Sequence, residues 1–185
     1  MLKHEIRSCI ARKRRYLSAR EKHALDEKII KTLANLKEWK KARTILIYIA
    51  HKEEIDTFEI IRKNIKKKKI IVPKTHLRFH SLSLHHIKSF DDLYKGRYGL
   101  LEPVLDTPMI DPNKVDLAII PGTAFDKNGH RIGYGKGYFD KLNKFLHCPK
   151  IGLAYSFQII DNIPADKHDV KMNILITEKD ILFFN

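Results

Sequence analysis

The chain has 185 residues, of which 43% are hydrophobic. This is the size and composition of a globular protein, and we expect a single domain over residues 1–185 that acts as a monomer. The longest apolar run, residues 45–50, is too short to cross a bilayer, and residues 1–5 carry no apolar signal core, so we expect a cytoplasmic protein without a membrane partner. The formal net charge of +14 lies almost entirely in residues 1–74, which hold 22 Lys or Arg against 9 Asp or Glu, and this excess attracts anions such as nucleic acid, ATP or a polyglutamate tail.

Two helices are expected at the start of the chain. Leu2, Ile6 and Ile10 recur at helical spacing, which predicts a first helix. Ser18 and Glu21 form a capping-box pattern that predicts the start of a second helix. The apolar stripe of this second helix is expected at Leu25, Ile29, Leu33 and Leu36.

Strand-like and helix-like segments then alternate along the chain. Apolar runs predict strands at residues 44–49, 69–72, 117–120, 151–155 and 174–177, with a half-exposed strand at 78–84. Pro73 is expected to stop the second of these strands. Further helices are expected at residues 58–67 and 138–146. Strands that are apolar throughout and alternate with helices predict one three-layer α/β/α domain with a mostly parallel central sheet.

Polar residues follow several of the predicted strands. In parallel sheets, ligands bind outside the carboxyl ends of the strands. Four loops each follow one predicted strand: residues 53–54, Lys74, residues 121–122 and the segment from Ser156. These loops are expected to converge on one rim of the sheet.

Residues 121–140 form a glycine-rich segment between a predicted strand and a predicted helix. Five of the eight glycines lie between Gly122 and Gly137. The glycine spacing fits neither a Walker A loop nor the dinucleotide-binding fingerprint. Two interpretations remain open on the residues alone: a glycine-rich surface turn with a basic rim, or a phosphate site formed by backbone amides with Arg131 and Lys136.

The segment follows the pattern P-G-x-A-F-D-x-x-G-x-R-[hydrophobic]-G-x-G-x-G-Y-[Y/F]-D, which resembles the signature of the 5-formyltetrahydrofolate cyclo-ligase family. The resemblance extends from Lys3 to Thr177. It includes the opening Lys3-x-x-x-Arg7, residues 53–57, residues 98–103 and the late Asp169. This sequence departs from the family pattern at Lys136, Phe139 and Asn173.

The resemblance implies an activity and a set of site residues. The activity is ATP- and Mg²⁺-dependent closure of 5-formyltetrahydrofolate to 5,10-methenyltetrahydrofolate through a phosphorylated formyl intermediate, with release of ADP and phosphate. The implied catalytic residues are Arg131 and Lys136. The implied ATP-binding residues are Lys3, Arg7, Arg131, Ile132, Gly133, Tyr134, Gly135, Lys136, Gly137, Tyr138 and Phe139. The implied folate contacts are Ile49, Glu54 and Tyr98, and the implied Mg²⁺ ligands are Asp140 and Asp169.

Some residues have no place in that pattern. Arg12–Arg15 is interpreted as a solvated or RNA-attracting face, and the histidine pair His85–His86 as surface or hydrogen-bonded polar residues. Cys9 and Cys148 form no CxxC motif, which favours a reducing compartment over zinc binding.

The alternatives come from other classes of protein. A basic RNA-binding module rests on charge alone, so nucleic acid is not the expected partner. A sugar-phosphate isomerase or a CoA transferase on a similar scaffold does not explain a glycine loop flanked by Arg and Lys together with a distant carboxylate.

Overall fold

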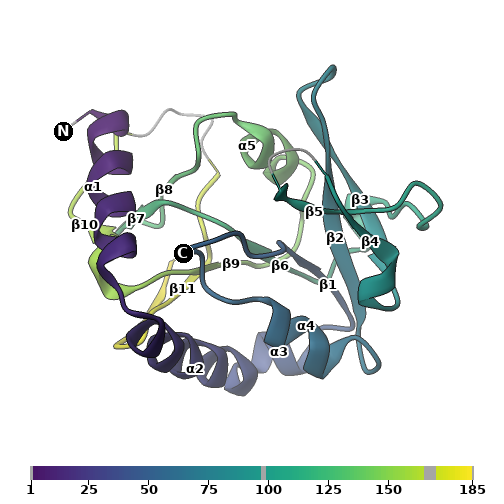
Figure 1. The fold of residues 1–185 in the computed structure, drawn as a ribbon, viewed down its shortest axis with the longest axis horizontal. Helices are drawn as coiled ribbons and strands as arrows, with labels where there is room; N and C mark the ends of the chain where they lie inside the picture. The colour runs from purple at the N-terminus through teal and green to yellow at the C-terminus, as the bar shows by residue number, and fades with distance from the viewer. Residues whose placement is uncertain (1, 97–98, 165–169, 185) are drawn as a thin grey trace.

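The computed structural model describes residues 2–96, 99–164 and 170–184 (Figure 1). Its centre is a sheet of seven strands, in the order β12 (Ile181–Phe183), β11 (Ile174–Ile176), β9 (Lys150–Leu153), β6 (Leu117–Ile120), β1 (Thr44–Ile47), β2 (Lys69–His76) and β3 (Ser81–Ile87). Neighbouring strands from β11 to β2 are parallel, whereas the two edge strands pair antiparallel. The predicted mostly parallel sheet is confirmed.

Helices cover the two faces of this sheet. Helices α2 (Ala19–Asn35), α3 (Lys37–Lys41) and α4 (Phe58–Asn64) lie on one face and α5 (Tyr138–Asn143) lies on the other, while α1 (Lys3–Tyr16) packs elsewhere. Figure 1 shows α2, α3 and α4 below the sheet and α5 above it. Successive side chains of a strand point to opposite faces, so Ile45 and Ile47 pack in the core under α2–α4 while Leu46 packs with Leu142 of α5. The predicted three-layer α/β/α architecture follows from these two cores.

Smaller elements complete the structure. One small sheet has the order β10 (Ile159–Ile160), β7 (Ala124–Asp126) and β8 (Arg131–Ile132), and another pairs β4 (Leu93–Lys95) with β5 (Leu101–Pro103). The described residues include the short 3₁₀ helices η1 (Phe90–Asp92), η3 (Pro112–Lys114) and η4 (Ser156–Gln158). Within the described residues, no helix has the length and apolar character needed to span a bilayer.

Helix α1 packs on the three-stranded sheet. Its apolar residues Ile6 and Ile10 form a separate cluster with Ala124, Ile132 and Ile163. This contact brings Arg7, the residue after Ile6, against Gly133 in the loop that follows β8. The helix that begins the sequence therefore lies beside a loop more than a hundred residues away.

The predicted start of the second helix is confirmed. The Ser18 hydroxyl accepts a hydrogen bond from the Glu21 amide at 3.3 Å, and the Glu21 carboxylate accepts one from the Ser18 amide at 2.9 Å. This reciprocal pair satisfies two amides that the helix itself leaves unpaired.

The prediction that Pro73 ends a strand is wrong. Strand β2 continues through Pro73 to His76. Its parallel pairing with β1 ends at Ile71, while β3 pairs with the rest of β2 from the other side. The proline, which has no N–H to donate, thus lies where β1 no longer runs beside β2.

Other predicted boundaries also differ from the structure. The strand expected at residues 78–84 is β3, Ser81–Ile87, because residues 77–80 form the turn of the β2–β3 hairpin. The helices expected at residues 58–67 and 138–146 end earlier, at Asn64 and Asn143.

The histidine pair divides between two environments. His85 is buried, and its ring bonds to the Ser83 hydroxyl at 2.8 Å and the Thr107 hydroxyl at 3.0 Å. His86 is partly exposed on the same strand. The interpretation of the pair as surface or hydrogen-bonded residues is consistent with both positions.

Candidate active site

Residues 133–137 of the glycine-rich segment form an irregular loop, the glycine loop, between β8 and α5. Gly135 and Gly137 have φ angles of +96° and +68°, a backbone region that residues with a side chain rarely adopt. Gly137 is also the residue that precedes α5. The two glycines therefore allow a tight turn in which the backbone itself can approach a ligand.

This loop forms one wall of a cavity of about 720 Å³ at the carboxyl ends of the strands. The other walls come from α1, the loop after β1 and the β2–β3 hairpin. The predicted site residues that line the cavity are Arg7, Ile49, Glu54, Arg131, Gly133, Tyr134, Lys136, Gly137, Tyr138, Phe139 and Asp140. The fold thus brings together residues from four distant parts of the sequence, as the rule for parallel sheets predicts.

Several predicted residues lie elsewhere. Lys3, Ile132 and Gly135 are not among the described residues that line the cavity. Tyr98 and Asp169 lie outside the residues that the structure describes.

The side chain of Ile132 points away from the cavity. It is buried against Ile6 and Ile10 of α1, and its carbonyl accepts a hydrogen bond from the Thr123 amide at 2.7 Å. Its observed role is to hold the loop against α1. A contact between its backbone and ATP stays a prediction.

Two arginines hold the glycine loop in place. The Arg7 Nε donates to the Gly133 carbonyl at 2.8 Å, and a Cβ added at Gly135 would lie 3.5 Å from the Arg7 Cζ. The Arg131 Nη1 donates to the Pro121 carbonyl at 2.9 Å, and its Nη2 forms an ion pair with Asp140. Both guanidinium groups therefore lie beside the loop on the cavity wall.

Glu54, in the loop after β1, is a buried carboxylate on the cavity wall. Its Oε1 accepts a hydrogen bond from the Tyr134 hydroxyl at 2.5 Å, and its Oε2 accepts one from the His51 amide at 2.8 Å. Burial raises the pKa of Glu54, and these hydrogen bonds together with the nearby Arg14 charge act in the opposite direction. Such a carboxylate can accept hydrogen bonds from the N–H groups of a flat heterocycle, as was predicted for the pterin ring.

Arg14 is a cavity residue that the sequence interpretation missed. Its assignment to a solvated or RNA-attracting face is wrong, because Arg14 is only 8% exposed and lines the cavity, whereas Arg12, Lys13 and Arg15 are exposed. A signal was present in the spacing. Arg14 follows the buried Ile6 and Ile10 in steps of four, so it continues the inward face of α1.

Lys74 was also expected at the rim, and the structure places its side chain elsewhere. Its Nζ donates to the Pro103 carbonyl at 2.6 Å and lies 4.7 Å from the centre of the Tyr94 ring. The flanking Pro73 and Thr75 line the cavity instead. Alternation along β2 explains the difference, because neighbouring residues of a strand face opposite sides.

Of the two predicted Mg²⁺ ligands, the structure describes only Asp140. Asp140 lines the cavity with its side chain 46% exposed. The described part of the chain contains no group of three or more His, Cys, Asp or Glu side chains that could hold a metal ion by themselves. A single carboxylate on the cavity wall is compatible with Mg²⁺, which is often bound by one or two carboxylates together with nucleotide phosphates.

Asn173, the departure near the predicted late carboxylate, has a structural role. Its side-chain Oδ1 accepts a hydrogen bond from the Lys150 backbone amide at 2.9 Å, and its backbone amide donates to the Lys150 carbonyl at 2.8 Å. The side chain therefore ties the start of β11 to β9.

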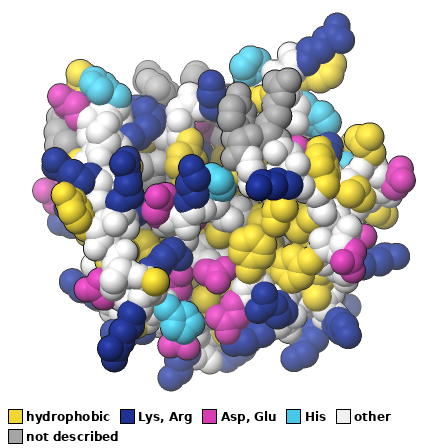
Figure 2. Space-filling view, viewed as in Figure 1, with side chains coloured by type: hydrophobic (Ala, Val, Ile, Leu, Met, Phe, Trp, Pro, Cys, Tyr) yellow, Lys and Arg dark blue, Asp and Glu magenta, His cyan; other side chains and the backbone are white. Residues whose placement is uncertain are grey.

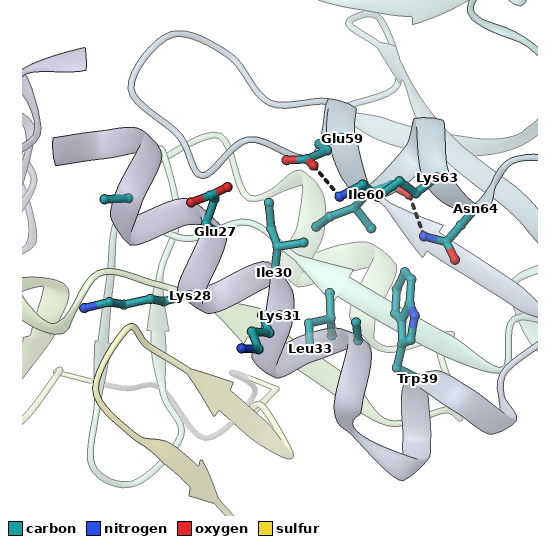
Figure 3. Close-up of a pocket in the computed structure, with 12 residues that line it drawn as sticks. Glu27, Lys28, Ile30, Lys31, Leu33, Trp39, Glu59, Ile60, Lys63 and Asn64 are labelled. Atoms are coloured by element: carbon teal, nitrogen blue, oxygen red, sulfur yellow. Dashed lines mark hydrogen bonds and ion pairs between the residues drawn. The ribbon is translucent and has the colours of Figure 1, made fainter. Parts of the chain in front are cut away.

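A second cavity, of about 590 Å³, lies among the helices below the sheet. Figure 3 shows Leu33, Trp39 and Ile60 lining it from α2, α3 and α4, with the Glu59–Lys63 ion pair at its edge. This hollow contains none of the predicted site residues.

A cavity at the carboxyl ends of parallel strands is typical of α/β proteins that bind small molecules there. The sequence model of the 5-formyltetrahydrofolate cyclo-ligase family matches residues 1–178, and the chain belongs to that family. It is accordingly an enzyme, a ligase of folate one-carbon metabolism.

Solved structures and curated relatives agree with this family. The NMR structure of Aquifex aeolicus 5,10-methenyltetrahydrofolate synthetase is 37% identical, with a TM-score of 0.89 over all of this chain and 94% of that one. A 5,10-methenyltetrahydrofolate synthetase from Mycoplasma pneumoniae is 31% identical, with a TM-score of 0.76 over 96% of this chain and 99% of that one. The 5-formyltetrahydrofolate cyclo-ligase of Haemophilus influenzae is 29% identical over 92% of this chain and 94% of its own length.

The cytoplasmic location of this protein stays a prediction, because one relative from the same family is named for another compartment. A 5-formyltetrahydrofolate cyclo-ligase from Arabidopsis thaliana, 28% identical over 97% of this chain and 75% of its own length, is named as mitochondrial.

Proposed function

We propose that this protein uses ATP to close 5-formyltetrahydrofolate into 5,10-methenyltetrahydrofolate, with release of ADP and phosphate. The family match supports the reaction. One observation carries the assignment of this reaction to a site. A single cavity has the glycine loop with Arg7, Arg131 and Lys136 on one wall, and it has the buried Glu54 on another. A polyphosphate suits the first wall, and a hydrogen-bonding heterocycle suits the second.

The reaction needs two steps in sequence. The formyl oxygen attacks the γ-phosphorus of ATP, and ADP leaves. The N10 nitrogen of the folate then attacks the formyl carbon and loses its proton, and the carbon–oxygen bond breaks as phosphate departs. The oxygen of the formyl group thus leaves on phosphate, which is a far better leaving group than oxide or hydroxide.

In this mechanism the protein positions its substrates and offsets charge. Backbone amides from Gly133 to Phe139 hold phosphate oxygens, and Arg131 and Lys136 stabilise the charge that develops on the transferred phosphoryl group. Lys3 and Arg7 bind the rest of the polyphosphate. No side chain is required as a nucleophile.

The folate lies at the other wall. The Glu54 carboxylate accepts hydrogen bonds from the pterin amino groups, and Ile49 and Tyr98 contact the ring. Asp140, with Asp169, would hold Mg²⁺ on the phosphates, where the ion supplies additional positive charge.

A turnover assay tests the proposal. The protein is mixed with ATP, MgCl₂ and 5-formyltetrahydrofolate, and the absorbance of the methenyl product is followed. We expect product only when ATP and folate are both present. Absence of turnover, together with an RNA mobility shift that weakens steeply with salt, would favour the RNA-binding alternative. Figure 2 shows Lys and Arg scattered over this face, both near its centre and at its edge, and interleaved with Asp and Glu rather than gathered into one basic patch.

A further inference from the structure

Arg14 is a buried cation in the cavity wall. Its Nη2 donates to the Gly122 carbonyl at 2.8 Å, and its Nη1 donates to the Tyr134 hydroxyl at 3.1 Å. Its Nε is buried and has no hydrogen-bond partner among the described residues. A guanidinium keeps its charge at every pH at which proteins fold, so a full positive charge faces the site.

Arg14 begins a chain of hydrogen bonds that ends on Glu54. The Tyr134 hydroxyl accepts a bond from Arg14 and donates its own proton to the Glu54 carboxylate. Each hydrogen bond in such a chain polarises the next. These two hydrogen bonds connect three separate segments: α1, the glycine loop, and the loop after β1.

Tyr134 is suited to carry this connection. Tyr134 is 58% exposed as a residue and lines the cavity, while its hydroxyl bonds to Arg14 and to Glu54. Burial raises the pKa of the Tyr134 hydroxyl, and the Glu54 charge raises it further, so the hydroxyl keeps its proton and remains a donor. A residue of the glycine loop thus contacts the carboxylate assigned to folate.

We propose that Arg14 is a positioning residue for the folate end of the site, acting through Tyr134 to keep the Glu54 carboxylate ionised and fixed on the cavity wall. This inference rests on the proposed function, because it assigns Glu54 to folate recognition. It gives one face of α1 two roles, since Arg7 contacts the Gly133 carbonyl and Arg14, about two turns further along the helix, reaches Glu54 through Tyr134.

The groups around Glu54 set the direction of the pH effect. Burial raises the pKa of Glu54, and the Tyr134 hydrogen bond, the His51 amide and the electrostatic effects of Arg14 and His51 lower it. The neighbouring Tyr48 phenol is buried and its pKa is raised well above the ordinary value, so it stays neutral. Loss of Arg14 therefore raises the pKa of Glu54, and the carboxylate becomes protonated at a higher pH.

The test compares Arg14→Leu with Arg14→Lys, which keeps the charge, and with Arg15→Leu, the exposed neighbour on α1. Steady-state rates are measured against pH with each substrate varied in turn. For Arg14→Leu we expect the KM for 5-formyltetrahydrofolate to rise roughly 10-fold and the KM for ATP to change less than about twofold. The acid limb of kcat/KM for folate should move to higher pH, Arg14→Lys should recover part of the loss, and Arg15→Leu should match the wild type.

Tyr134→Phe keeps the inference testable if Arg14→Leu does not fold. It removes only the hydroxyl, and we expect the same rise in folate KM and the same shift of the acid limb. If the wild type turns over and Tyr134→Phe keeps both quantities unchanged, Arg14 does not act through Tyr134 and the inference is wrong. If the wild type neither turns over nor binds 5-formyltetrahydrofolate, it is the proposed function that fails.

Discussion

Arg131 and Asp140 form an ion pair that joins the two ends of the glycine loop. Arg131 belongs to β8, where the loop begins, and Asp140 to the first turn of α5, where it ends. The Arg131 side chain is only 5% exposed and also donates to the Pro121 carbonyl, so its guanidinium is held from two sides. A cation assigned to phosphate and a carboxylate assigned to Mg²⁺ thus fix the geometry of the loop between them.

Replacement of Lys136 by Ala should lower turnover and leave the fold unchanged. Lys136 is exposed on the cavity wall, so little packing is lost. Loss of one charged group that stabilises a developing phosphoryl charge should reduce kcat/KM on the order of 10²- to 10³-fold. Steady-state kinetics and the melting temperature measure the two effects. Lys144→Ala, an exposed lysine just after α5, is the control; wild-type kinetics in Lys136→Ala would remove this lysine from the site.

Asp140→Asn should increase the magnesium concentration needed for half-maximal rate. The amide is a poorer ligand for a hard cation than the carboxylate, and the substitution also removes the ion pair between Asp140 and Arg131. The measurement is a magnesium titration of the turnover rate at saturating ATP. Asp161→Asn is the matched surface variant, since Asp161 is almost fully exposed. Superimposable titrations for Asp140→Asn and wild type would argue against metal binding at this position.

Glu54→Gln should weaken folate binding selectively. The carboxylate accepts from the Tyr134 hydroxyl and the His51 amide, and a glutamine can accept only through one of its two terminal atoms. We expect the KM for 5-formyltetrahydrofolate to rise about 10- to 100-fold, with a smaller change in the KM for ATP. Glu59→Gln on α4 is the control, because it removes a carboxylate that lies outside the cavity that Glu54 lines. An equal rise in both KM values would show that Glu54 does not act on folate specifically.

Asp126→Asn should destabilise the fold at neutral pH. Asp126 is fully buried and accepts hydrogen bonds from the amides of Asn128, His130 and Ile163 and from the His130 ring. An amide in its place would set an NH₂ group against these donors, at a cost of roughly 2–4 kcal/mol in the free energy of unfolding. Urea unfolding at pH 7 measures this difference, with the exposed Asp106→Asn as control. A change below about 0.5 kcal/mol would contradict the structural role.

The same residue predicts a pH dependence. Burial alone would raise the pKa of Asp126, but the hydrogen bonds from Ile163, His130 and Asn128 together outweigh it and lower the pKa. A carboxylate with a lowered folded-state pKa contributes stability above its unfolded pKa of about 4, and this contribution disappears as the pH falls through the folded value. The stability gap between wild type and Asp126→Asn should therefore narrow in urea unfolding below pH 4. A gap of constant size would mean that Asp126 does not titrate with unfolding.

The fold class and part of the cavity wall could be predicted from the sequence alone. Apolar strands alternating with amphipathic helices require a buried parallel sheet, and this requirement is local enough to be seen in residues 44–47 or 117–120. The rule that loops at the carboxyl ends of strands converge then placed Glu54 near the glycine loop. The family signature supplied the roles, because spacing alone left the glycine loop open between a surface turn and a phosphate site.

The direction in which individual side chains face, and the pairing of their charges, could be seen only in the folded protein. Arg14 is part of a basic cluster in the sequence, yet packing of Ile6 and Ile10 on β7 and β8 turns it into the cavity, where it bonds to Tyr134. The Arg131–Asp140 pair likewise depends on how α5 follows its loop. Hydrophobic periodicity is a property of neighbouring residues, whereas burial and hydrogen bonding of a charge depend on segments a hundred residues apart, and these meet only when the sheet has formed.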